Sequence, residues 1–150
     1  MTSAQPVRLY IAHNFVEHED FHKAIEYIES RENFMYVNTA SPDIRPDGGK
    51  EAEHEELTKQ IGLAEIVIVP VNVYKSAPDD IDYQLRVAEN FKKPVLGIQG
   101  FGETMEVPRA LLDACGDIVE WEPRRIVTAI KRLARNEQIG DYEVIEFTLE

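Results

Sequence analysis

Hydrophobic and polar positions form two alternating patterns along this chain. Short continuous apolar runs, rich in β-branched residues, are typical of strands that are buried on both faces of a sheet. Between these runs, apolar residues recur at the i, i+3, i+4 spacing of amphipathic helices. Strands are predicted over residues 7–12, 34–38, 66–69, 94–99 and 117–121. Helices are predicted around 21–28, 57–64, 81–88, 108–114 and 126–133.

This alternation predicts an α/β fold with a parallel sheet and right-handed crossovers, with helices on both faces. With about five strands and no glycine-rich fingerprint, we expect a flavodoxin-like three-layer sandwich with strand order 2-1-3-4-5. The whole chain, 1–150, is predicted to be a single domain, with residues 1–6 as a short lead-in. Residues 137–150 are β-prone after Gly140 and are predicted to form either an extra strand or an oligomerisation tail.

The segment Glu65–Ala88 is the predicted ligand-binding unit. Its strand is expected to break at Pro70 and to pass into a polar loop. A helix is expected to start at Ser76, which resembles a capping box with Asp79, three residues later. In open α/β sheets the loop of such a strand–loop–helix unit usually carries the ligand.

A site is therefore predicted at the switch point between the first and third strands. It would gather the residues that follow strand ends, namely His13, Asn14, Phe15, Asn38, Ser41, Asn72 and Tyr74, with Gln84 on the next helix. Each has a structural alternative. For His13 the alternative is a hydrogen bond to a neighbouring backbone carbonyl. For Asn38 and Ser41 it is the shaping of their turn, and for the aromatic rings it is packing in the core.

The composition limits the classes of partner that this protein is expected to bind. Sixteen basic and 28 acidic residues give a formal charge of −12, which argues against binding to nucleic acids or to anionic membranes. A small anionic ligand remains compatible with this charge. A single cysteine, with neither a signal peptide nor a membrane-spanning run in the sequence, favours a cytoplasmic protein.

Other candidate chemistries have less support in the sequence. His18 and His22 satisfy H-E-x-x-H, the spacing of zinc proteases, but no third ligand stands out, and two solvated histidines are the simpler interpretation. We therefore predict no metal site, and keep a zinc enzyme as a remote alternative. Cys115 lies among small apolar residues without a neighbouring histidine, which indicates a buried thiol. No serine lies in a G-x-S-x-G elbow.

Several segments, in order and with sensible gaps, resemble the TIR-like family of the bacterial Thoeris anti-phage defence systems (the ThsB-like group). These segments are residues 10–13, 38–42, 64–69, 93–98 and 117–121. The resemblance implies a TIR-type fold and a signalling role in bacterial immunity. It also implies NAD⁺ as substrate or ligand, with no further cofactor, and as partners a downstream effector protein and other copies of the chain.

TIR-type enzymes carry a glutamate in the helix after the third strand, where a carboxylate stabilises the cationic transition state of NAD⁺ cleavage. This chain has Gln84 at the aligned position. An amide cannot be ionised, so either Asp80, one turn earlier, or Asp82, in a shifted alignment, would have to supply the charge. The alternative role of Asp79 and Asp80 is only to cap and charge the helix start. Two hypotheses follow: a glycohydrolase or cyclase-type NAD⁺ enzyme with doubtful cleavage, and a non-catalytic TIR-like interaction or self-association module.

Overall fold

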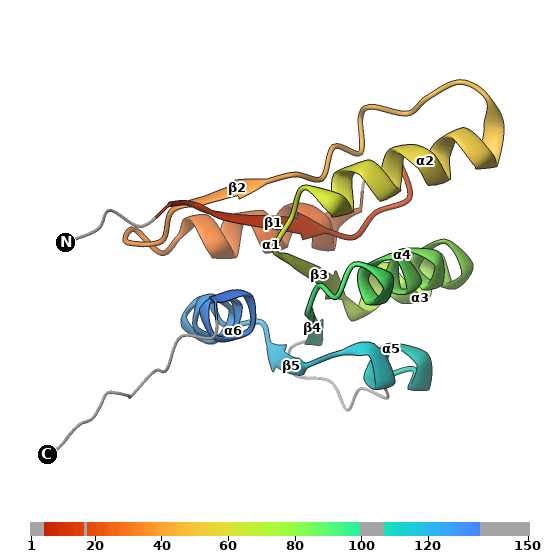
Figure 1. Cartoon of the computed structure of the whole chain (residues 1–150). Coiled ribbons are helices and arrows are strands. Elements are labelled where there is room, and N and C mark those ends of the chain that lie inside the picture. Colours follow the sequence, from red (N-terminus) through yellow and green to blue (C-terminus); the bar gives the residue numbers. More distant parts are fainter. Residues whose placement is uncertain (1–4, 17, 100–106, 136–150) are drawn as a thin grey trace, which may run out of the picture.

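A computed structural model describes residues 5–16, 18–99 and 107–135. Strands and helices alternate along these residues (Figure 1). The strands are β1 (Val7–Ile11), β2 (Tyr36–Asn38), β3 (Ile66–Pro70), β4 (Val95–Gln99) and β5 (Asp117–Glu120). The helices are α1 (Glu19–Glu29), α2 (Gly49–Gly62), α3 (Val71–Ser76), α4 (Pro78–Asn90), α5 (Arg109–Ala114) and α6 (Pro123–Arg135). None of the described helices is long and apolar enough to cross a membrane.

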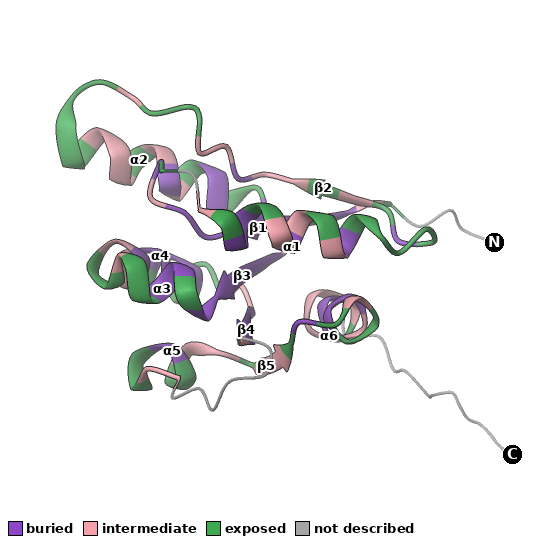
Figure 2. Ribbon diagram, turned by 180° about the vertical axis from the view of Figure 1, so that it is seen from behind, coloured by how far each residue is buried: buried purple, intermediate pink, exposed green. Residues whose placement is uncertain are grey.

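The strands form one sheet in the order β2-β1-β3-β4-β5, and every pairing is parallel. Helices α1 and α6 pack together on one face, while α2, α4 and α5 pack side by side on the other (Figures 1 and 2). This arrangement confirms the predicted α/β class, the three layers and the strand order of a flavodoxin-like fold. The connections between successive strands run through these helices, as parallel pairing requires.

The core is centred on β3, the middle strand of the sheet. All five of its residues are buried, as Figure 2 shows, because helices cover both faces of the sheet at this strand. The neighbouring strands β1 and β4 are also largely buried, whereas the edge strand β2 is not. The continuous apolar run that predicted β3 is thus explained by its central position.

The segment after β3 differs from the prediction. The strand continues through Pro70, and the expected polar loop is the short helix α3. The capping box at Ser76 is wrong: the Ser76 hydroxyl donates to the carbonyl of Val73, and α4 has no side-chain cap. Pro78 opens α4 instead, since a proline fits the first turn of a helix. Ser76 ends a helix instead of starting one, so its hydroxyl bonds to the preceding turn.

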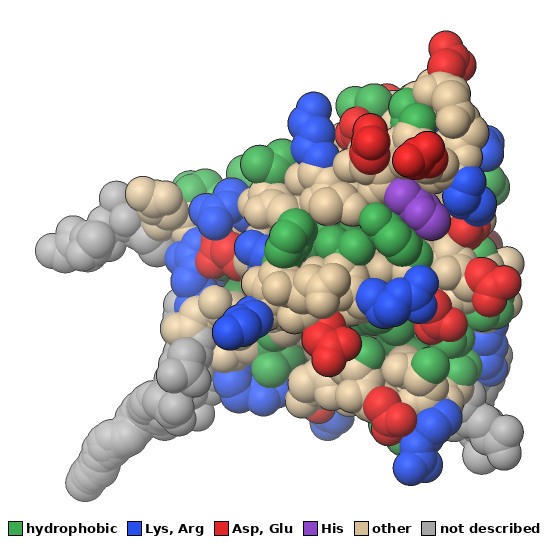
Figure 3. Space-filling view, turned by 45° about the vertical axis from the view of Figure 1, so that its right-hand side comes forward, with side chains coloured by type: hydrophobic (Ala, Val, Ile, Leu, Met, Phe, Trp, Pro, Cys, Tyr) green, Lys and Arg blue, Asp and Glu red, His purple; other side chains and the backbone are tan. Residues whose placement is uncertain are grey.

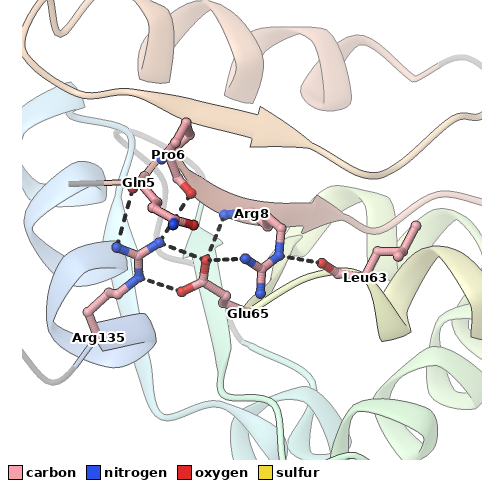
Figure 4. Close-up of polar contacts among 6 residues, drawn as sticks. All are labelled: Gln5, Pro6, Arg8, Leu63, Glu65 and Arg135. Carbon is pink, nitrogen blue, oxygen red and sulfur yellow. Dashed lines mark hydrogen bonds and ion pairs between the residues drawn. The ribbon is translucent and has the colours of Figure 1, made fainter. Parts of the chain in front are cut away.

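An ion-pair cluster ties the end of α6 to the start of β3 (Figure 4). The Glu65 carboxylate accepts hydrogen bonds from Arg135, with Nη2 at 2.8 Å, and from the backbone N–H of Arg8 at 3.1 Å. Arg135 also donates to the carbonyl oxygens of Gln5 and Pro6, which anchors these two residues. The hydrogen bond from Arg135 is the main cause that lowers the pKa of Glu65 to about 2. The predicted extra strand or tail at 137–150 lies outside the described residues.

Candidate functional site

The predicted site lies where β1 and β3 end, at the switch point of the sheet. His13 follows β1, Asn72 lies in the first turn of α3 directly after β3, and Gln84 lies on α4. Chain connections leave β1 and β3 towards opposite faces, which makes this point the topological switch of the sheet. The topology therefore brings the strand-end residues to one edge of the sheet, as predicted.

Gln84 is completely buried and joins α4 to the end of β1. Its Oε1 accepts a hydrogen bond from the Tyr10 hydroxyl at 2.7 Å and a longer one from the His13 N–H at 3.4 Å. Its Nε2 donates to the carbonyl oxygen of His13 at 2.5 Å and to that of Asp80 at 3.3 Å. Both ends of the amide are thus bonded within the protein, as a buried polar group requires.

The His13 ring is also buried, with 2% of the residue exposed. Its Nδ1 accepts from the backbone N–H of Phe15 at 3.1 Å, so the ring proton lies on Nε2, which donates to Gln60 Oε1 at 2.9 Å. Burial lowers the pKa of His13, and the hydrogen bond to Gln60 partly opposes this shift. The Phe15 ring packs edge-on against the imidazole, and its backbone has a positive φ of 66°. His13 is therefore a neutral structural imidazole that fixes the turn after β1.

Gln60 on α2 is a buried residue that sequence reasoning missed. Its Oε1 accepts from the Ser41 N–H at 3.0 Å as well as from His13, and its Nε2 donates to Glu56 at 2.9 Å. It joins the turn after β1 to the turn after β2. A signal was present, because Gln60 lies three residues after Leu57 on the inward stripe of an otherwise acidic helix.

The other strand-end residues are more open. Asn38 Oδ1 accepts from the Ala40 N–H at 3.0 Å and shapes the turn after β2. Ser41, which is half-buried, is held through its backbone N–H and carbonyl. Asn14 is half-buried as well, and Asn72 is exposed. Asn72 Nδ2 donates to Asp20 of α1 at 3.1 Å, which links the start of α3 to the start of α1.

The carboxylates considered as substitutes for the missing glutamate each have a partner. Asp82 accepts from the hydroxyl of Tyr74, a buried residue, at 2.8 Å. Burial, followed by this hydrogen bond, raises the pKa of Tyr74 to about 12. Asp80 forms an ion pair of 2.8 Å with Lys50 at the start of α2. Asp80 lies in the first turn of α4, and 29% of its side chain is exposed.

The histidine pair with the zinc-protease spacing and the single cysteine are the remaining candidates. His18 precedes α1 as its cap, with Nδ1 accepting from the Asp20 N–H, so it does not share a helix face with His22. No group of three or more His, Cys, Asp or Glu side chains among the described residues is placed to hold a metal ion. Burial raises the pKa of the Cys115 thiol to about 12, which leaves it unreactive at neutral pH.

Chemically, this edge offers amide and hydroxyl groups for hydrogen bonding, and the carboxylates Asp20, Asp80 and Asp82 each have a partner within the described residues. Such an edge can hold a polar ligand, but it supplies no charge from position 84. Comparisons with protein-family models and with curated proteins find no match to this chain. The resemblance to TIR-like proteins therefore rests on the sequence segments alone.

Proposed function

We propose that this chain is a TIR-like signalling module that binds NAD⁺ or a related nucleotide at the carboxyl ends of β1, β2 and β3, without cleaving it. The observation that carries the proposal is the position of Gln84. It lies on α4, the second helix after β3, at the position where the resemblance implies a catalytic glutamate, yet it is a neutral and buried link between α4 and β1.

Cleavage of NAD⁺ expels nicotinamide as a neutral molecule and leaves a cationic ribosyl group. A carboxylate beside the ribose stabilises that cation, and its loss costs roughly 3–5 kcal/mol, or two to four orders of magnitude in rate. Gln84 cannot be ionised, and its exposed fraction is 0%. Both its Oε1 and its Nε2 are occupied by backbone groups and by Tyr10. Binding without turnover is the function that fits these features.

The binding half of the proposal rests on the exposed polar groups at the same edge. Asn72 is exposed, and Asn14 and Ser41 are half-buried, next to the rigid turn that His13 and Gln60 hold. A rigid turn lowers the entropy cost of ordering contacts around a ligand. Lys50, at the start of α2, adds one exposed cation beside Asp80, suited to a phosphate oxygen.

In this proposal the bound nucleotide controls association with other proteins. The resemblance implies a downstream effector of anti-phage immunity as the partner, in the cytoplasm. A second candidate function is constitutive self-association through the edge strand β2. It is favoured by the exposure of Met35 and Val37, 64% and 49%, at the unpaired edge of the sheet.

The test uses the full-length protein, with calorimetric titration of NAD⁺ and measurement of released nicotinamide. We expect binding without release. Asn72→Ala should weaken NAD⁺ about tenfold, as expected for one lost polar contact, while Asn90→Ala, at the far end of α4, should leave it unchanged. Nicotinamide release that Asp80→Asn abolishes would establish an enzyme instead. Absence of NAD⁺ binding together with a concentration-dependent dimer that Val37→Lys dissolves would favour the self-association module.

A further inference from the structure

Helix α6 is the most basic element of an acidic protein. Its sequence, PRRIVTAIKRLAR, contains five basic residues and no acidic ones, although the chain as a whole has a formal charge of −12. By contrast, acidic and basic side chains are interspersed on the side of the molecule that carries α2, α4 and α5 (Figure 3). A concentration of positive charge against the overall balance needs a local explanation.

Part of that charge is explained by ion pairs. Arg132 pairs with Asp117, and Arg135 pairs with Glu65. Arg124 and Lys131 lie seven residues apart, on one side of α6, together with Val127 and Thr128. Within the part of the chain that the structure describes, neither of these two cations forms an ion pair.

Arg124 and Lys131 line a cavity of about 340 Å³ between α6 and the connection from α1 to β2. That connection adds a third cation, Arg31, and the amide of Asn33, while α6 adds the hydroxyl of Thr128. The Phe34 ring forms part of the wall, with Lys131 Nζ 5.9 Å from its centroid. Glu32 is the acidic side chain of the lining, so three cations face one carboxylate.

We propose that this cavity binds the phosphate group of a small molecule, a phosphomonoester of about the size of a mononucleotide. Guanidinium groups match phosphate oxygens with two parallel hydrogen bonds, and a lysine adds a compact third charge. Hydroxyl and amide donors complete the set of contacts that a phosphate takes. The apolar part of the wall is formed by Val127 and the edge of the Phe34 ring, both of which are largely buried. The volume is at the lower end of the range for small-molecule sites.

This site is separate from the proposed nucleotide site at the strand ends. Residues 30–35 precede β2, so they lie at the edge of the sheet where the strands begin. His13 and Asn72 follow their strands and Asn38 ends β2, so all three lie at the opposite edge. The two sites share no residue, so the proposal for either site can be refuted without refuting the other.

Adjacent arginines provide the test. Arg124 lines the cavity and Arg125 does not, yet both are exposed residues in the first turn of α6. Calorimetric titration of the full-length protein would compare AMP, adenosine, inorganic phosphate and succinate. We expect AMP to bind at least about tenfold more tightly than adenosine, and phosphate more tightly than succinate. Arg124→Gln and Lys131→Gln should each weaken AMP about tenfold, and Arg125→Gln should not.

Equal losses of AMP affinity in Arg124→Gln and Arg125→Gln would overturn the proposal, because they would indicate general electrostatic attraction. Succinate binding as tight as phosphate binding, or no binding of AMP, would overturn it as well. Asn72→Ala, chosen for the other edge, should leave AMP affinity unchanged. A loss of AMP affinity in that variant would place the phosphate-binding site at the strand ends instead.

Discussion

The Gln84 side chain and the main chain of His13 form a closed pair of contacts, in which the amide donates to the histidine carbonyl and accepts from its N–H. The two residues are 71 positions apart in sequence and are both buried. The pair connects α4 to the turn after β1. Position 84 is therefore part of the framework of the switch point. We expect a substitution there to lower the free energy of unfolding rather than to create a catalytic group.

Gln84→Glu is therefore expected to destabilise the protein and not to create NAD⁺ cleavage. The new carboxylate would face the carbonyl oxygens of His13 and Asp80 in place of the amide donor, at a cost of about 2–4 kcal/mol at neutral pH. Burial raises the pKa of this glutamate above its unfolded value of about 4.3, so the cost is absent at lower pH and grows as pH rises through that value.

Urea unfolding across this pH range measures the effect. Gln84→Met is the matched control, because it removes the same hydrogen bonds without adding a charge and should show a pH-independent loss. Equal stability of wild type and Gln84→Glu at neutral pH, or nicotinamide release by that variant, would contradict the structural role of the amide.

His13 should make stability fall in mild acid. Burial lowers the pKa of the folded imidazole below the unfolded value of about 6.5, so the stabilisation is complete above that value and is lost as pH falls through it towards the folded pKa. His13→Leu should lose about 1–3 kcal/mol at neutral pH, because Gln60 loses its donor, but should lose less stability on acidification. Unfolding midpoints at about pH 7.5 and about pH 5.5 test this.

His22→Gln, at an exposed position, is the control and should show the same pH dependence of stability as the wild type. Equal losses of stability on acidification in the wild type and in His13→Leu would contradict the assignment to His13.

The Glu65 cluster should contribute stability at neutral pH. Its carboxylate has a pKa of about 2 in the folded protein, below the unfolded value of about 4.3. The contribution is therefore present above the unfolded value and is lost as pH falls towards about 2. Glu65→Gln should cost about 1–3 kcal/mol at neutral pH, with the difference narrowing in acid. In chemical denaturation, Asp113→Asn, which breaks a pair exposed on both sides, should cost far less; similar costs would refute the importance of the cluster.

Gly97 in β4 is expected to tolerate no side chain. A Cβ at this position would lie 3.1 Å from Cys115 Sγ and 3.2 Å from Ile118 Cγ1, which is overpacked. Gly97→Ala should lower the free energy of unfolding by about 1–3 kcal/mol, and Cys115→Ala in the same chain should restore part of it. Gly62→Ala, whose nearest contact is Phe91 at 3.5 Å, should be neutral or stabilising at its position in α2. Thermal unfolding that shows no difference between the two variants would disprove the tight contact.

Much of the fold could be predicted because its determinants are local. Continuous apolar runs such as Ile66–Val69 require burial on both faces, and right-handed crossovers leave few strand orders for such runs. The same logic placed His13, Asn38 and Asn72 at one edge, since residues that follow parallel strands share that edge. Where a local signal was ambiguous the prediction failed: Ser76 ends α3, because hydroxyl residues bond to either end of a helix.

The sequence by itself therefore determined the sheet, its strand order and the edge at which strand-end residues gather, because periodicity and chain crossing rules act on short segments. Only the tertiary structure decided which distant side chains meet. Gln84 with Tyr10, His13 with Gln60, and the cations of α6 with Arg31 are each brought together by packing between elements far apart in the chain. Hydrogen bonds and cavities depend on positions to within a fraction of an ångström, and no local pattern of residues contains that information.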